Sequence, residues 1–307
     1  MRKTSLDMVQ EMALRDPRIL FIGSDLGPDT LKELKVQRPK QFLMEGVSEA
    51  NIVSMAAGMA MEGWIPYINT IATFLTRRCF EQIVLDLGLH KTKVRLIASG
   101  GGLVYAPLGP THLAIDDIAI LRTVPNMTIL APCDADEMRR LMLLTPDVDG
   151  PVYIRLGKGG DPVVSRAEPA CEIGKAILLR EPGDALIVTT GVCLQVALAA
   201  AAELGKAGIS AGVLHCHTLK PLDADAILKH AAPVVVTIEE HILIGGLGGA
   251  VAEILLGAGR APRFARIGIP DAFADQYGSQ ASLMARYSIT SENLAATVTR
   301  LLNQTHK

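Results

Sequence analysis

The sequence predicts an α/β protein of two domains, each built on a mostly parallel sheet flanked by helices. Short apolar runs bounded by Gly, Pro, Asn or Asp alternate with helical patterns along the chain. The 307 residues are 49% hydrophobic, which is enough to bury two cores rather than one. A Gly- and Pro-rich stretch, GKGGDPVVSRAEPA, interrupts the alternation near the middle of the chain.

The first domain is expected to span residues 1–165. It opens with an amphipathic helix in MRKTSLDMVQEMALRD, which lacks the long apolar segment of a secretory signal. The expected strands are residues 19–22, 65–69, 94–98, 128–131 and 152–156, and the expected helices are residues 48–63, 73–90 and 135–144.

A linker over residues 166–182 is expected to lead into a second, smaller α/β domain at 183–307. Its expected strands are residues 185–189, 211–215 and 234–238, and its expected helices are residues 194–206, 223–230 and 248–256. The GGLGG before the last helix follows a strand, but it lacks the spacing of a dinucleotide-binding turn. We interpret it as a structural helix entry.

The helix at 48–63 carries an acid on an apolar face. With Ser48 as N-cap and Gly63 as its end, the inward residues are Ile52, Met55, Ala56, Met59 and Ala60. Glu49 lies one turn before Ile52, at the edge of that face. Burial would favour a carboxyl that holds or shares a proton with a ligand nitrogen. Alternatively, Glu49 is a solvated partner of the helix dipole, which spacing alone favours.

Composition excludes several classes of protein. The formal net charge is −2, and no basic run interleaves with aromatic residues, so no nucleic-acid partner is expected. Polar residues break the most apolar windows, so no membrane span is expected. Five widely spaced cysteines, without a CxxC pattern, indicate reduced thiols of a cytoplasmic protein. The histidines do not fall at metal-ligand spacing, so no metal site held by this chain alone is expected.

Two polar residues lie where ligands bind in parallel sheets. His112, in LGPTHLAIDD, follows the Gly-rich SGGGLVYAPLG on a loop. Arg155 ends a strand at the domain boundary, where it would clamp an anionic group or pair with a surface acid.

Six segments occur in the order seen in the C-terminal half of transketolases. They are GVSEANIVSMAAGMAMEGWIPYINTIATFLTRRCFEQI, GPTH, VPNMTILAPCDADEM, PVYIRLGKG, HTLKPLD and EEHILIGGLGG. The chain resembles this half from Arg2 to the segment at 277–290. It also resembles 1-deoxyxylulose-5-phosphate synthases and, more distantly, the beta subunits of 2-oxo acid dehydrogenases. The resemblance implies a pyrimidine-binding domain followed by a transketolase C-terminal domain.

The resemblance implies thiamine diphosphate as cofactor and assigns it to five residues. Glu49 matches the glutamate that hydrogen-bonds the aminopyrimidine ring nitrogen and so promotes loss of the thiazolium carbon-2 proton. Phe74 matches the aromatic that packs against the pyrimidine, and Phe80 a second ring of the pocket, although Phe80 would equally suit the core. Arg77 matches the synthase pattern, and Asp25 is a further expected cofactor contact.

The diphosphate half of such a site is missing from this sequence. In the family, a Gly-Asp-Gly motif followed by Asn holds the diphosphate and its magnesium, and no GDG occurs here. The resemblance therefore implies a split-gene product. It needs a diphosphate-binding N-terminal subunit, which holds most of the magnesium contacts, in an α2β2 assembly.

Substrate residues depart from the sugar-using pattern. The histidine and aspartate that usually precede GPTH are replaced by Gly100 and Leu108, and a phosphate-binding serine by Asp29. Arg2 and Arg155 still match phosphate-binding arginines.

We therefore expect two-carbon ketol transfer from a ketose to an aldehyde, with His112 stabilising charge on the donor oxygen. The departures at Gly100 and Leu108 allow an unusual ketose. The alternatives are a decarboxylating 2-oxo acid acyl transferase or dehydrogenase subunit, and a non-catalytic assembly subunit.

Overall fold

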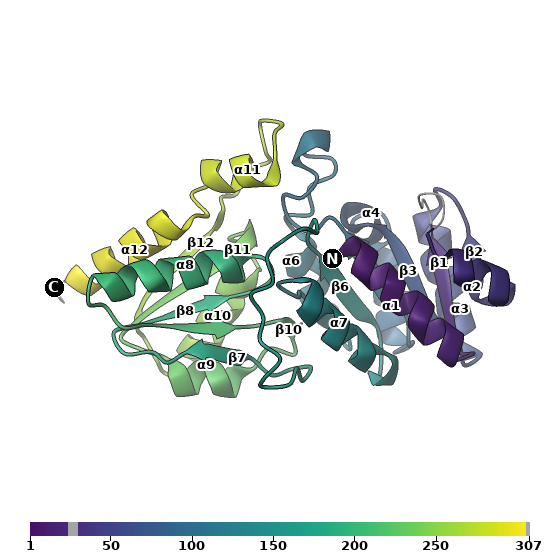
Figure 1. The fold of residues 1–307 in the computed structure, drawn as a ribbon, viewed down its shortest axis with the longest axis horizontal. Coiled ribbons are helices and arrows are strands. Elements are labelled where there is room, and N and C mark those ends of the chain that lie inside the picture. Colours follow the sequence, from purple (N-terminus) through teal and green to yellow (C-terminus); the bar gives the residue numbers. More distant parts are fainter. Residues whose placement is uncertain (24–29, 305–307) are drawn as a thin grey trace.

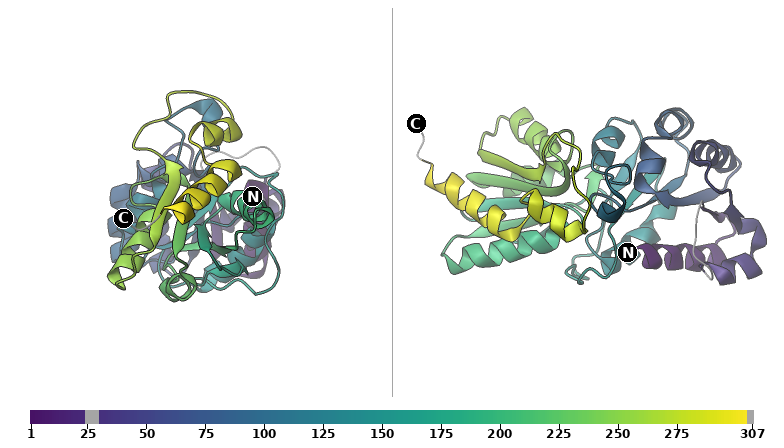
Figure 2. Two further views of the ribbon diagram at one scale, coloured as in Figure 1. Left: turned by 90° about the vertical axis from the view of Figure 1, so that its left-hand side faces the viewer. Right: turned by 90° about the horizontal axis from the view of Figure 1, so that it is seen from above.

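The computed structural model describes residues 1–23 and 30–304, and these fold into two α/β lobes that lie side by side (Figure 1). The N-terminus lies at the junction of the lobes, as the view from above also shows (Figure 2). A Cβ added to Gly159 would lie 2.9 Å from the backbone nitrogen of Met1, so the first residue packs against the connecting segment.

The first sheet contains seven strands within the described residues, in the order β10-β5-β6-β4-β3-β1-β2. They are β1 (Ile19–Gly23), β2 (Phe42–Met44), β3 (Ile65–Ile71), β4 (Arg95–Ser99), β5 (Thr128–Leu130), β6 (Val152–Leu156) and β10 (Thr218–Lys220). Neighbouring strands are parallel except for β10, which pairs antiparallel with β5. β10 belongs to the first sheet but comes after β8 and β9 of the second sheet in the sequence. No single point in the chain therefore divides the two sheets. The boundaries at 165 and 183 stay a prediction.

Helices cover both faces of the first sheet (Figure 1). They are α1 (Arg2–Arg15), α2 (Lys32–Gln37), α3 (Glu49–Met61), α4 (Ala72–Thr76), α5 (Phe80–Gln82), α6 (Asp117–Arg122) and α7 (Ala135–Leu144). The helical pattern predicted around 73–90 is confirmed as helical but is divided into α4, α5 and a π-helix. The chain turns after α4, where the Cys79 thiol donates to the Phe74 carbonyl at 3.3 Å, and a π-helix over Ile83–Leu89 follows α5.

The second sheet has five strands within the described residues, in the order β12-β11-β8-β9-β7. They are β7 (Ile177–Arg180), β8 (Ala185–Thr189), β9 (Ala211–His215), β11 (Val234–Ile242) and β12 (Arg263–Ile269). All pairs are parallel except β7 with β9. Its helices are α8 (Cys193–Lys206), α9 (Ala224–His230), α10 (Leu247–Gly257), α11 (Gln280–Arg286) and α12 (Ser291–Asn303).

One apolar core runs through both lobes. It joins α3 and one face of the first sheet to α9, α10 and the facing side of the second sheet. A second core lies between α1, α7 and the opposite face of the first sheet, so that Leu96 and Ile97 of β4 enter different cores. The third core packs α8 and α12 on the second sheet. In the part of the chain that the structure describes, no helix is long and apolar enough to cross a membrane.

The apolar face of α3 differs in part from the predicted one. Ile52 and Ala56 are fully buried as expected, but Val53 and Ala57 are buried with them, while Met55 and Met59 are only partly covered. The helix begins at Glu49 as predicted. However, Ser48 forms no side-chain cap, because its hydroxyl donates to the Glu45 carbonyl.

We predict that Ile52→Ala destabilises the isolated chain by about 2–5 kcal/mol, because it leaves a cavity in the shared core. Leu89→Ala, at a side chain that is 70% exposed, is the control and should change stability by less than about 0.5 kcal/mol. Urea unfolding followed by circular dichroism measures both. Equal effects of the two substitutions would contradict the burial of α3.

Candidate active site

Glu49 stands at the first position of α3 and is 5% exposed. It is therefore not the solvated dipole partner that spacing alone favoured. Its Oε2 lies 3.3 Å from Nη1 of Arg78, whose side chain is 49% exposed. Because Arg78 is half-exposed, it can move away, and the buried Glu49 carboxylate can then bond a ligand in its place.

Arg78 also covers the ring of Phe74. Its guanidinium carbon lies 3.6 Å from the ring centroid, in a cation–π contact. The planar guanidinium thus contacts both the acid and the aromatic ring assigned to the pyrimidine. Sequence reasoning missed Arg78, although it follows directly after TFLTR.

Phe74 also contacts His112. Their ring centroids are 5.2 Å apart in an edge-on arrangement, and His112 Nδ1 lies 2.9 Å from the Thr111 hydroxyl. The structure therefore brings Glu49, Phe74 and His112 into one contiguous group, with Arg78 between the first two.

Arg77 positions the loop that carries His112. Its Nε and Nη2 donate to both carboxylate oxygens of Asp116 at 2.9–3.2 Å, and Nη2 also donates to the Leu113 carbonyl. A two-point bond of this kind fixes direction as well as distance. In this structure Arg77 holds protein groups, and its expected contact with the cofactor stays a prediction.

Arg155 is buried and bonded within the protein. Its Nε donates to Asp117 Oδ2 at 2.8 Å, and its Nη2 donates to the carbonyls of Ala114 and Glu240. Burial acts to lower the pKa of Arg155, but the Asp117 carboxylate outweighs it, and the net pKa lies above the ordinary value. Asp117 is fully buried, so the paired acid is not on the surface as the sequence interpretation had it.

Phe80 and Arg2 are the remaining expected residues that the structure describes. Phe80 begins α5 and is 36% exposed, so its interpretation as plain core is wrong. Arg2 is exposed at the start of α1. Asp25 and Asp29 lie outside the described residues.

A pocket of about 290 Å³ lies between the first residues of α1 and the Gly-rich segment. It is lined among others by Arg2, Tyr105, Leu108, Lys158 and Gln280. Gly100 also lines it, with φ +83°, and an added Cβ there would lie 2.1 Å from the Tyr105 ring. Tyr105 therefore occupies the space into which a side chain at position 100 would project.

Glu240 supports the Gly-rich segment from β11. Its Oε1 accepts from the Leu103 amide at 2.7 Å, and Gln280 donates to both of its oxygens. Burial raises the pKa of Glu240 to about 7, although the Arg155 charge acts in the opposite direction. The sequence offered only an EEH triplet at the end of a strand as a signal for this residue.

We predict that Glu240 makes the fold less stable as pH rises from about 4.5 to about 7. In this window the carboxyl ionises in the unfolded chain but stays protonated when folded, so the unfolded state binds fewer protons. Glu240→Gln should flatten this part of the curve of unfolding free energy against pH, measured by urea denaturation. Glu253→Gln, at an exposed position, is the control. An unchanged slope in Glu240→Gln would contradict the assignment.

Comparisons with known proteins match both domains of the chain. Residues 1–160 match the family model of the transketolase pyrimidine binding domain, and residues 174–294 match that of the transketolase C-terminal domain. The chain is similar to a 6-deoxy-6-sulfo-D-fructose transketolase subunit of Clostridium sp., with 35% identity over 96% of this chain and 92% of the relative.

It is also similar to a 1-deoxy-D-xylulose-5-phosphate synthase of Syntrophotalea carbinolica, with 38% identity over 95% of this chain and 46% of that protein. Among solved structures, a split gene transketolase described as an inactive beta4 tetramer superposes with a TM-score of 0.91. It is 33% identical, and the match covers 99% of both chains.

Proposed function

The chain belongs to the transketolase family, and on this premise we propose that it is the C-terminal subunit of a split, thiamine diphosphate dependent transketolase. The reaction is transfer of a two-carbon ketol unit from a ketose to an aldehyde acceptor. The observation that carries the proposal is the buried Glu49 carboxylate, which Arg78 joins to the Phe74 ring, with His112 in edge-on contact with the same ring.

These residues fit one half of the cofactor. An aminopyrimidine needs a carboxyl partner for a ring nitrogen and an apolar face to pack on, and Glu49 and Phe74 provide them. The flat, hydrogen-bonding guanidinium of Arg78 already makes both contacts, so the site accepts a planar donor. When bound, thiamine diphosphate supplies the carbon nucleophile. Glu49 holds or shares the proton at the ring nitrogen.

His112 is placed to act on the substrate. It projects from the loop fixed by Arg77 and is partly exposed, so its imidazole can donate to the oxygen of the donor ketone as charge develops there. The Thr111 hydroxyl at Nδ1 supports an orientation that leaves Nε2 for the substrate.

The cofactor's diphosphate and its magnesium require a second polypeptide. The sequence has no GDG motif, and we assign these contacts to an N-terminal subunit in an α2β2 assembly. The structural neighbour made of beta subunits alone is described as inactive, which supports a need for a partner.

The donor is a ketose that does not rely on the usual pair of polar residues before GPTH. Tyr105 fills the space at Gly100, and Leu108 is 49% exposed beside it. Arg2 and Lys158 line the same pocket and favour an anionic group on the substrate. A relative named for 6-deoxy-6-sulfo-D-fructose supports an unusual ketose of this kind.

Reconstitution tests the proposal. The chain is copurified with the product of a neighbouring gene that carries GDG, then supplied with thiamine diphosphate, magnesium, ketose phosphates, sulfonated ketoses and 2-oxo acids, with aldehydes as acceptors. Ketol transfer to an aldehyde supports the proposal. Carbon dioxide release from a 2-oxo acid would favour a decarboxylating subunit instead. No reaction with any donor would contradict the proposal and favour a non-catalytic assembly subunit.

In the reconstituted enzyme, we predict that Glu49→Gln lowers kcat by about 10²-fold or more, because an amide cannot hold the transferable proton. Glu62→Gln, at an exposed position directly after α3, is the matched control and should retain full activity. Steady-state kinetics measures both. Wild-type activity in Glu49→Gln would sink the catalytic assignment.

Arg78→Ala gives a second prediction for the same complex. Arg78 bonds the Glu49 carboxylate and covers the face of Phe74 in the free chain, so the cofactor must displace it. Removing this side chain should therefore tighten thiamine diphosphate binding by up to about tenfold. Isothermal titration calorimetry measures the Kd, with Arg15→Ala on the exposed side of α1 as control. Weaker binding in Arg78→Ala would instead place the guanidinium among the cofactor's own contacts.

A further inference from the structure

A cluster of polar side chains lies where the two domains and their connecting segment meet. Glu137 comes from α7, Cys171 from the connecting segment, and His217 from the turn between β9 and β10. Each offers one atom able to bind a metal, and these three atoms lie within 4.8 Å of one another. Linear spacing predicted no such site, because the three residues belong to three distant segments.

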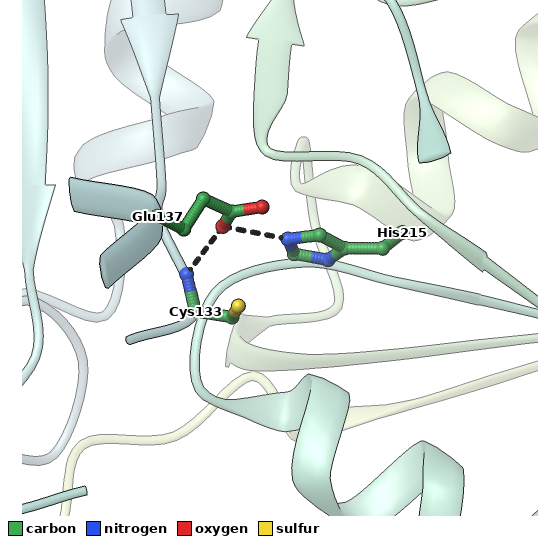
Figure 3. A group of neighbouring side chains, drawn as sticks. All are labelled: Cys133, Glu137 and His215. Carbon is green, nitrogen blue, oxygen red and sulfur yellow. Dashed lines mark hydrogen bonds and ion pairs between the residues drawn. The ribbon is translucent and has the colours of Figure 1, made fainter. Parts of the chain in front are cut away.

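Glu137 is held so that one of its oxygens is free. Its Oε2 accepts from the Cys133 amide at 2.7 Å and lies 2.9 Å from His215 Nε2 (Figure 3). Its Oε1 is buried and has no hydrogen-bond partner among the described residues. Burying a polar atom without a partner is costly, so this oxygen calls for a ligand.

His217 also has a buried atom without a hydrogen-bond partner among the described residues, its ring nitrogen Nε2. Its Nδ1 lies 3.0 Å from the Thr218 hydroxyl oxygen, which also accepts from the Gly174 amide. This arrangement suits the tautomer with the proton on Nδ1, which leaves a lone pair on Nε2. Within the described part of the chain, Nε2 is buried without a partner. An imidazole oriented through its other nitrogen is the usual arrangement of a metal-binding histidine.

Cys171 completes the set and is only half-buried. Arg140 Nε donates to its sulfur at 3.4 Å, but burial raises the pKa of the Cys171 thiol on balance. The thiolate would therefore form as the metal binds and displaces the proton. A thiolate and a carboxylate together balance the charge of a divalent cation. Cys171 is the one of the three residues that is not fully buried, and a water molecule would be the fourth ligand.

We propose that Glu137, Cys171 and His217 bind a divalent transition metal ion, with zinc as the best match. Mixed sulfur, nitrogen and oxygen ligands suit zinc, whereas magnesium and calcium prefer oxygen alone. Ligand atoms bonded to one zinc ion at about 2.0–2.3 Å lie within the 4.8 Å limit that this cluster meets. The neighbouring Cys133 and His215 then orient Glu137 from outside the coordination sphere.

The consequence concerns the arrangement of the domains. The three ligands come from the first domain, the connecting segment and the second domain, so a bound ion links all three. The folded chain binds the metal in preference to the unfolded chain and is stabilised by it. This inference does not rest on the proposed reaction, because it is measured without substrate, cofactor or partner subunit.

The test uses the full chain, purified under reducing conditions and stripped with a chelator. Zinc is titrated in competition with a chromophoric chelator, and cobalt(II) is added in parallel. We expect one zinc ion per chain, a thiolate-to-cobalt charge-transfer band, and a melting temperature that rises with zinc concentration. Zinc far below one per chain, or a cobalt complex without the thiolate band, would overturn the site.

Variants identify the ligands. Cys171→Ser at the half-exposed position should weaken zinc binding more than tenfold, and Thr218→Val about tenfold through the orientation of His217. Cys193→Ala, in the core of the second domain, should bind as wild type. Unchanged binding in Cys171→Ser would overturn the proposal, as would loss in Cys133→Ala with retention in Cys171→Ser. Circular dichroism of each stripped variant confirms that it folds.

Discussion

The buried ion pair of Arg155 and Asp117 is the constraint on which the arrangement of the site depends. Arg155 extends from β6 of the first sheet and bonds the Asp117 carboxylate at the start of α6, the Ala114 carbonyl in the His112 loop, and the Glu240 carbonyl in the second domain. Tyr153 adds a second donor to Asp117 at 2.7 Å. Both of these hydrogen bonds reach Asp117 Oδ2, whereas Oδ1 has no hydrogen-bond partner among the described residues. Removing one partner of a buried ion pair costs about 3–5 kcal/mol. One guanidinium therefore ties the sheet, the loop and the second domain together.

The sequence predicted most of the parallel strands because their burial on both faces produces continuous apolar runs. β6, β8 and β9 match the predicted bounds in full. The strands that were missed include β2 and β10, which have three residues each, and β7 and β12, which lie at the edges of the second sheet. A strand of three residues is too short to show a periodic pattern even where it is buried, as Leu219 of β10 is, and the edge strands β7 and β12 are only partly buried.

Of the site, the sequence reached Glu49, Phe74 and His112 through family motifs, and the structure places them together. Spacing alone had favoured a solvated Glu49, because the cover over that carboxylate includes residues outside its own helix. Arg78 and Glu240 were beyond sequence reasoning for the same reason. Their importance comes from contacts with residues 29 and 137 positions away in the chain.

The second domain contributes to the site through orientation. An apolar core runs across the junction of the lobes, but apolar contacts tolerate sliding, whereas hydrogen bonds in a buried setting fix direction. Glu240 holds the Leu103 amide, and its carbonyl holds Arg155, which in turn holds Ala114. The segment that contains His112 is thus bonded to Glu240 of β11 near both of its ends, directly at Leu103 and through Arg155 at Ala114. A change in the angle between the domains would move His112 relative to Glu49, whose side chain is bonded to Arg78 of the first domain. The angle between the domains is therefore part of the geometry of the candidate active site.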